Sequence, residues 1–291
     1  MSPPLPESSM AIRSVGVVGS GQMGNGIAQV AACCGMEVTM VDIKQEFLDR
    51  GESAISDSLE KLVSKERMSR EEADSAFSRI STSVALSSLS DCDLVVEAIP
   101  EIPDLKFSTF RELDSICKPE AILASNTSSI SINDIASQTN RADRVIGMHF
   151  MNPVPIMKLV EVINGSETSE EVTSAVISAS EEMGKTPLSC QDSPGFVSNR
   201  VLMPMINEAI LVLQDEVAEP AAIDGIMKLG MNHPIGPLAL ADLIGLDTVL
   251  HIMHVLKEGL SSDKYSPADL LVEMVEEGKL GRKTGCGFYQ Y

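Results

Sequence analysis

Basic residues are scarce in this chain of 291 residues. It contains 22 lysines and arginines against 42 aspartates and glutamates, which gives a formal net charge of −20. Because so acidic a surface repels phosphates, the composition excludes a general nucleic-acid-binding protein. An anionic ligand would have to be held by a local group of lysines, arginines or backbone N–H donors.

Metal-binding and membrane-spanning patterns are also missing. The six cysteines include no C-x-x-C pair, and the adjacent Cys33 and Cys34 suit neither a metal site nor an ordinary disulfide. His251 and His254 have helical spacing but lack a third ligand. No apolar run approaches the roughly 18 residues of a membrane span, and the N-terminal segment lacks the features of a secretory signal. We therefore expect no metal, no membrane partner, and a location in the cytoplasm or an organelle matrix rather than secretion.

The chain does contain alternating strand-like and helix-like segments, followed by helices alone. Apolar runs predict strands at residues 12–20, 36–42, 92–99, 121–125, 144–150, 157–163 and 185–190. Helical patterns lie between them, and one, residues 44–79, is expected to break near Met68, where Ser69 and Glu72 form a capping box. The later helical patterns cover residues 194–217, 220–230, 237–260 and 266–278. We predict an α/β fold with a disordered tail (1–11), a Rossmann-like domain (12–190) and an all-helical domain (191–291).

A glycine-rich motif, G-x-G-x-x-G, lies between the first predicted strand and the first predicted helix. Asp42 ends the next strand, 18 residues after the last glycine. This context predicts a dinucleotide site in which backbone N–H groups approach the pyrophosphate. Asp42 would accept hydrogen bonds from ribose hydroxyls and repel a 2′-phosphate, which favours NAD over NADP. The alternative is a structural glycine turn with a surface aspartate. The motif consists of Gly19, Ser20, Gly21, Gln22, Met23 and Gly24.

Two ionisable residues interrupt apolar strands on either side of a proline-containing linker. His149 lies in "RVIGMHF" and Glu161 in "MKLVEVI". Taken alone, His149 could equally be a core histidine with satisfied hydrogen bonds. A buried glutamate without a partner is costly, however, and a glutamate facing an imidazole stabilises its protonated form. We therefore predict a His–Glu pair that exchanges a proton with an alcohol while hydride leaves its carbon.

Two polar clusters have weaker signals. The stretch "SNTSSI", residues 125–130, follows a predicted strand, and loops at the carboxyl ends of parallel strands bind ligands. Such clusters are more commonly turns and helix caps. Asn199 lies in "PGFVSNR" at the start of the helical domain. Its alternative role is that of an ordinary amide on a helix surface.

Seven motifs together resemble the 3-hydroxyacyl-CoA dehydrogenase family. The resemblance runs from about residue 12 to the C-terminus and is greatest to the stand-alone 3-hydroxybutyryl-CoA dehydrogenases, which lack a fused hydratase domain. The motifs occur in the family's order, which makes a chance match very unlikely. They are "GSGQMGNGIAQVAA", "DLVVEAIPE", "ASNTSSISI", "GMHFMNPVPIMKLVEV", "PGFVSNR", "HPIGPLALADLIGLD" and "LGRKTGCGFYQY".

The resemblance implies roles for individual residues. His149 matches the catalytic base and Glu161 its orienting carboxylate. Ser128 and Asn199 match residues that hydrogen-bond the substrate's reacting oxygens and order the nicotinamide end. The positions that match the lining of the NAD or substrate pocket are Glu101, Lys106, Asn152 and Lys283. Those that match CoA contacts are Ser58, Lys65 and Lys106.

Spacing adds a separate argument for a CoA contact. Ser58, Lys61 and Lys65 have the spacing i, i+3, i+7 and therefore share one helical face. In so acidic a chain, two lysines on one face could receive a CoA phosphate. An ordinary solvated helix face explains the same spacing equally well.

The resemblance implies a reaction and an assembly. NAD-dependent reversible oxidation of (S)-3-hydroxyacyl-CoA to 3-ketoacyl-CoA is expected, with short-chain 3-hydroxybutyryl-CoA as the substrate, as in β-oxidation and butanoate metabolism. The helical domain is expected to close the substrate cleft and, being unusually apolar, to form a homodimer. Two alternatives stay open: an L-gulonate-type hydroxyacid dehydrogenase, and a non-catalytic, crystallin-like protein.

Overall fold

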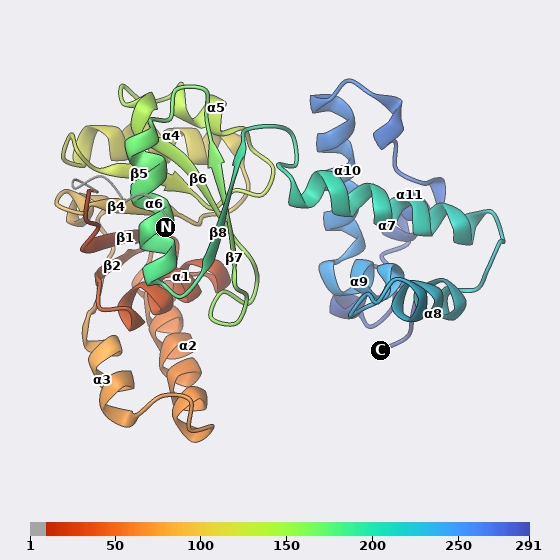
Figure 1. Ribbon diagram of the computed structural model, residues 1–291, viewed down its shortest axis with the longest axis horizontal. Coiled ribbons are helices and arrows are strands. Elements are labelled where there is room, and N and C mark those ends of the chain that lie inside the picture. The colour runs from red at the N-terminus through yellow and green to blue at the C-terminus, as the bar shows by residue number, and fades with distance from the viewer. Residues whose placement is uncertain (1–9) are drawn as a thin grey trace, which may run out of the picture. The chain divides into compact units, whose positions relative to one another are not determined.

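The structure, a computed structural model, describes residues 10–291 (Figure 1). The predicted tail, residues 1–11, lies outside the described residues except for its last two. The chain divides into two compact units, the first ending at Asp192 and the second comprising Ser193–Tyr291.

An eight-stranded sheet forms the centre of unit 1, in the order β3-β2-β1-β4-β5-β6-β7-β8. The first six strands are parallel, and their order is that of dinucleotide-binding folds. β7 then runs antiparallel to β6, and β8 runs parallel to β7. The strands are β1 (Ser14–Val18), β2 (Glu37–Val41), β3 (Ile80–Ser83), β4 (Leu94–Glu97), β5 (Ile122–Ser125), β6 (Val145–Phe150), β7 (Leu159–Asn164) and β8 (Thr186–Gln191).

Helices cover both faces of this sheet, which explains why its central strands are continuous apolar runs. Ile27 of α1 and Val176 of α6 share one buried cluster with Val17 and Met148 of the sheet. Gly147, on the opposite face, lies against Ile132 of α5. The helices of unit 1 are α1 (Gln22–Cys33), α2 (Gln45–Ser64), α3 (Arg70–Ser78), α4 (Pro103–Ile116), α5 (Ile132–Ala136) and α6 (Glu170–Glu182).

Helices α2 and α3 form a pair that extends from the sheet, drawn in orange in Figure 1. The predicted break between them is confirmed. Ser69 caps α3 by accepting a hydrogen bond from the backbone N–H of Glu72, whose side chain accepts from the N–H of Ser69. Strand β3, in contrast, was not predicted. It is a four-residue edge strand with no fully buried residue, so it lacks the apolar signal of the others.

Unit 2 is built from helices around its own buried core. The predicted continuous helical stretch 237–260 is wrong in one respect, because Gly245, at φ +101°, separates two helices that meet at 97°. Among the described residues no single helix is long and apolar enough to cross a membrane, and α9 and α10 reach that length only jointly. The helices are α7 (Ser198–Gln214), α8 (Pro220–Gly230), α9 (Pro237–Ile244), α10 (Leu246–Gly259) and α11 (Asp269–Glu276).

Two buried aspartates bind the C-terminal segment of unit 2. Asp242 accepts hydrogen bonds from the backbone N–H groups of Phe288 and Tyr289 and from the Tyr291 hydroxyl, each at 3.0 Å. Asp224 accepts from the Tyr289 hydroxyl at 2.8 Å and from two N–H groups in the first turn of α9. Asp224 therefore caps a helix that has no side-chain cap of its own.

Candidate active site

His149 and Glu161 lie directly opposite each other on the antiparallel strands β6 and β7. The two side chains are 11% and 5% exposed, and His149 Nδ1 lies 3.0 Å from Glu161 Oε2. Because a carboxylate only accepts, Nδ1 carries the donated hydrogen, and Nε2 is the ring atom through which such a histidine can exchange a proton. The arrangement is that of an acid–base pair with a fixed tautomer.

The glycine motif forms the turn between β1 and α1, and two of its three glycines, Gly19 and Gly24, are required there for steric reasons. Gly19 has φ +99°, and a Cβ at Gly24 would lie 1.8 Å from the carbonyl oxygen of Gly19. A Cβ at Gly21 would meet nothing within 4 Å, so this residue faces open space at the N-terminus of α1. The first turn of α1 carries no acidic residue, and Gly21 supplies no side-chain cap. These features fit an anionic pyrophosphate bound by backbone N–H groups.

Asp42 immediately follows β2 and is bonded to the same turn. Its Oδ2 accepts from both the N–H and the hydroxyl of Ser20, each at 2.7 Å, and its Oδ1 accepts from the N–H of Ile43 at 2.7 Å. Ser20 is only 3% exposed, so its hydroxyl positions Asp42 rather than facing a cofactor. Gln22, exposed, and Met23, half-buried, begin α1.

The turn after β5 gathers around Glu101. Oε1 of Glu101 accepts hydrogen bonds from the backbone N–H groups of Ser128 and Ser129 at 2.9 and 3.0 Å, and from the hydroxyls of Thr127 and Ser129. Burial alone would raise the pKa of Glu101, but the Lys106 ammonium and these donors outweigh it and lower the pKa. The cluster "SNTSSI" is therefore an ordered turn that presents Ser128 beside a charged carboxylate.

The same turn is bonded to the strand that carries His149. Asn126 Oδ1 accepts from the backbone N–H of Phe150, the residue after His149, at 2.9 Å. Because β5 and β6 are parallel neighbours, the Ser128 turn and the histidine lie at the carboxyl edge of the sheet. This is the edge where ligands bind in open α/β sheets.

Lys106 was expected to contact NAD or CoA directly, but its position in the structure does not support such a contact. Its side chain is 1% exposed, and its ammonium lies 2.6 Å from Glu97 Oε1 and 3.2 Å from Glu101 Oε2. A cation held between two carboxylates is an internal ion pair rather than a surface phosphate contact. The partner, Glu97, was missed by the sequence reasoning. Its signal was the same as that of Glu161, a glutamate within an apolar run of the sequence.

The other predicted site residues are Asn152 of unit 1 and two residues of unit 2. Asn152 is exposed in the linker between β6 and β7. Asn199 is 8% exposed near the start of α7. Lys283 lies 2.5 Å from Asp247, and Asp247 is near the start of α10. Asn199 and Lys283 therefore both belong to unit 2.

Ser58 and Lys61 lie on α2, and Lys65 directly follows its last residue. Both lysines are exposed, and within residues 10–291 neither ammonium has an ion-pair or hydrogen-bond partner. They are thus available to an anion.

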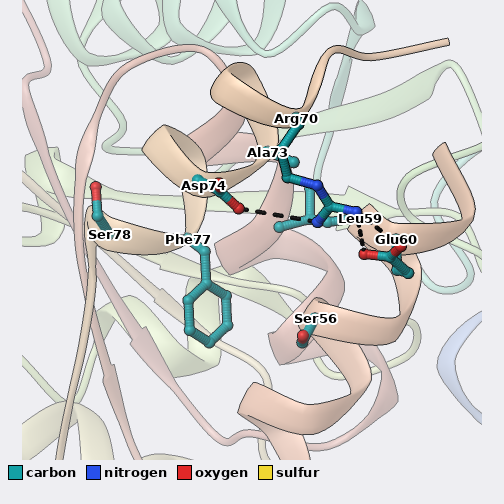
Figure 2. Close-up of a pocket in the computed structure, with 8 residues that line it drawn as sticks. All are labelled: Ser56, Leu59, Glu60, Arg70, Ala73, Asp74, Phe77 and Ser78. Carbon is teal, nitrogen blue, oxygen red and sulfur yellow. Dashed lines mark hydrogen bonds and ion pairs between the residues drawn. The ribbon is translucent and has the colours of Figure 1, made fainter. Parts of the chain in front are cut away.

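A groove between α2 and α3 lies on the same helical pair (Figure 2). Its cation, Arg70, is already paired with Glu60 at 2.7 Å, and the carboxylate of Asp74 is 3.9 Å away. Two carboxylates around one guanidinium do not suit a phosphate. The groove is lined by Ser56, Leu59, Glu60, Arg70, Ala73, Asp74, Phe77 and Ser78.

The fold and these side chains define a class, namely a dinucleotide-binding α/β protein with an acid–base pair at the carboxyl edge of its sheet. Comparison with known proteins identifies the family. The NAD-binding domain of 3-hydroxyacyl-CoA dehydrogenase matches residues 14–193, and the C-terminal domain of the same family matches residues 195–291. The chain belongs to the 3-hydroxyacyl-CoA dehydrogenase family, and NAD is the cofactor of its N-terminal domain.

Individual relatives are similar over almost their whole length. A probable 3-hydroxybutyryl-CoA dehydrogenase from Deinococcus radiodurans is 58% identical, with 95% of this chain and 99% of that protein covered. The crystal structure of (S)-3-hydroxybutyryl-CoA dehydrogenase from Ralstonia eutropha has a TM-score of 0.95 and 51% identity, and covers 97% and 99% of the two chains. The mitochondrial hydroxyacyl-coenzyme A dehydrogenase of Sus scrofa is 42% identical, with 96% and 91% covered.

Proposed function

We propose that this protein catalyses the reversible, NAD-dependent oxidation of (S)-3-hydroxyacyl-CoA to 3-ketoacyl-CoA, with 3-hydroxybutyryl-CoA as its substrate. The observation that carries the proposal is the buried His149–Glu161 pair, 3.0 Å apart, at the sheet edge reached by the Ser128 turn. Relatives named for this substrate, at 58% and 51% identity, support the short acyl chain.

His149 is the general base in the oxidation. NAD, when bound, would accept the hydride that leaves C3 of the substrate. Nε2 of His149 takes the proton of the 3-hydroxyl group as hydride leaves, and Glu161 stabilises the imidazolium through Nδ1. In the reverse direction the imidazolium returns this proton to the 3-keto oxygen. Burial of both side chains strengthens their interaction, because little water screens it.

The other contacts with the cofactor and the substrate would come from the turns and helices described above. The N-terminus of α1 would hold the pyrophosphate, and Asp42 the adenosine ribose. Ser128 would hydrogen-bond a reacting oxygen of the substrate and order the nicotinamide end, and Asn152 would line the NAD or substrate pocket. Ser58, Lys61 and Lys65 would receive the phosphates of CoA.

A homodimer through unit 2 is part of the proposal. Several apolar residues of unit 2 are strongly exposed, including Leu229 (91%) of α8, Val201 (67%) of α7 and Val217 (72%) between these two helices. Exposed apolar residues of this kind are typical of a subunit interface. Light scattering coupled to size-exclusion chromatography would give the mass in solution. The mass of one 31.2 kDa chain would contradict the dimer.

NADH consumption with acetoacetyl-CoA tests the reaction. Acetoacetate, a longer 3-ketoacyl-CoA and a keto sugar acid would be assayed beside it, each with NADH and NADPH. We expect fast turnover only with CoA esters and NADH. Turnover with the sugar acid alone would favour an L-gulonate-type dehydrogenase, and no turnover with any substrate would favour a non-catalytic protein. Equal rates with NADPH would contradict the role of Asp42.

A further inference from the structure

Glu97 is a buried carboxylate that joins three elements of unit 1. It ends β4 and is 0% exposed. Oε1 accepts from the Lys106 ammonium of α4 at 2.6 Å and from the N–H of Ile99 at 2.7 Å. Oε2 accepts from the Ser125 hydroxyl at the end of β5, also at 2.7 Å. Both oxygens are therefore fully engaged inside the protein.

Stability alone is a poor explanation for this arrangement. Two carboxylates, Glu97 and Glu101, share the single ammonium of Lys106, which leaves the group with a net negative charge. Buried ion pairs are often no more stable than apolar residues of the same volume. A triad with unequal charge, in which Glu97 and Lys106 are buried and Glu101 is 29% exposed, is thus expected where its geometry serves a purpose.

The contacts form a continuous series that ends at Ser128. Glu97 holds the Lys106 ammonium on one side, and that ammonium holds Glu101 on the other. Glu101 in turn accepts from the backbone N–H groups of Ser128 and Ser129. A second connection runs through Ser125, whose hydroxyl accepts from the N–H of Thr127 at 3.2 Å while donating to Glu97.

We propose that Glu97 is a positioning residue for the reaction, acting through Lys106, Glu101 and Ser125 to fix the turn that carries Ser128. The inference rests on the proposed function, because it assigns Ser128 to the reacting oxygens. Removing the Glu97 charge leaves the ammonium with one carboxylate, so Lys106 and Glu101 shift toward each other. The hydrogen bonds of the turn then lengthen, and Ser128 loses its fixed direction toward the substrate.

The test uses Glu97→Gln, which keeps the shape and removes the charge. Its matched control is Glu60→Gln, which breaks an ion pair of similar length, 2.7 Å, on the exposed surface of α2 and α3 (Figure 2). Three quantities are measured on the full-length protein: kcat and KM with acetoacetyl-CoA, the Kd of NADH from its fluorescence, and deuterium exchange of a peptide covering residues 125–130.

For Glu97→Gln we expect kcat to fall about 10-fold to 100-fold, because small misplacements of reacting groups cost this much. KM and the NADH Kd should stay within about threefold, and exchange in residues 125–130 should accelerate. Glu60→Gln should leave all three unchanged. Wild-type kcat and exchange in Glu97→Gln would overturn the proposal, as would a loss of NADH binding equal to the loss of kcat.

Two further measurements keep the inference testable. If Glu97→Gln does not fold, Ser125→Ala removes only the second connection, and it should accelerate exchange of the turn and lower kcat severalfold. Unchanged exchange in this variant would overturn the proposal. If the wild type has no activity with acetoacetyl-CoA, the proposed function fails. The exchange data then decide on their own whether Glu97 orders the turn.

Discussion

Both units bury acidic side chains, but they give them different partners. In unit 1, Glu161 faces an imidazole and Glu97 faces an ammonium, with hydrogen bonds of 3.0 and 2.6 Å. In unit 2, Asp224 and Asp242 accept only from backbone N–H groups and tyrosine hydroxyls.

Burial, and then the hydrogen bond to Asp224, raises the pKa of Tyr289, so that hydroxyl stays protonated at neutral pH. An imidazole, in contrast, is a side chain of the kind that can both take up and release a proton near neutral pH. Burial of a carboxylate therefore does not by itself indicate an active site, whereas a histidine as its partner does.

The largest expected effect is that of His149→Gln. Loss of the general base should lower kcat by about 10²-fold to 10⁴-fold. The variant should still bind NADH and unfold near the wild-type temperature, because glutamine retains a polar group opposite Glu161. Steady-state kinetics and NADH fluorescence provide the measurements. Turnover close to that of the wild type would show that the pair is structural, as in unit 2.

Asp242→Asn should have the opposite signature. The amide presents its NH2 group either to the N–H of Phe288 or to the donors of Tyr289 and Tyr291, and a buried donor left unpaired costs about 1–3 kcal/mol. We expect the free energy of unfolding to fall by about that amount or more, while kcat of the folded protein stays within about twofold. Urea unfolding followed by circular dichroism measures the first quantity. Tyr291→Phe, which removes one hydroxyl, should cost only about 1 kcal/mol. A large loss of kcat in folded Asp242→Asn would contradict the distinction between the units.

The sequence predicted the elements of unit 1 well because their apolar periods are strong. The glycine motif, the capping box at Ser69 and the two strands of the His–Glu pair all follow from local patterns. β3 was missed because an edge strand with half-buried residues has no such period. The break at Gly245 was missed because the apolar pattern continues through it, and only its φ of +101° reveals the turn.

The candidate site was predicted unevenly for a related reason. Glu161 was identified because a histidine stood in the neighbouring strand, which suggested a partner. Glu97 interrupts its strand in the same way, but its partner Lys106 lies on a helix surface in the sequence pattern. The lysine is buried, at 1% exposure, because α4 packs against the strand ends, and this packing is visible only in the structure. Contacts between elements far apart in the chain are not encoded in any local spacing.

The stability of the protein at acid pH should depend on the ion pair between Glu101 and Lys106. The lowered pKa of Glu101 means that its contribution to stability is present above the ordinary glutamate value of about 4.3 and is lost as pH falls through the lower folded value. Glu101→Gln should therefore flatten the decline of stability below pH about 4.5. Urea midpoints at several pH values between about 3 and 6 measure this. An unchanged slope would mean that Glu101 titrates alike in the folded and unfolded chain.

The smallest expected effect belongs to the exposed Lys65. An ammonium near a phosphate in water is worth about 1 kcal/mol at 4 Å, so Lys65→Ala should raise KM for acetoacetyl-CoA about 3-fold to 10-fold and leave kcat unchanged. The difference should shrink at high salt, because exposed charges are screened. Acetoacetyl-pantetheine, which lacks the nucleotide phosphates, should show no change in KM.

Arg67→Ala is the matched control, because Arg67 is an exposed cation two residues further along, beyond the end of α2. If both variants raise KM equally, the effect is one of net charge in a chain of charge −20 rather than of a contact. A change confined to Lys65 and to substrates with phosphates would instead locate CoA on α2. The exposed charges of the α2–α3 pair would then bind the substrate, while the buried His149–Glu161 pair at the sheet edge would carry out the proton transfer.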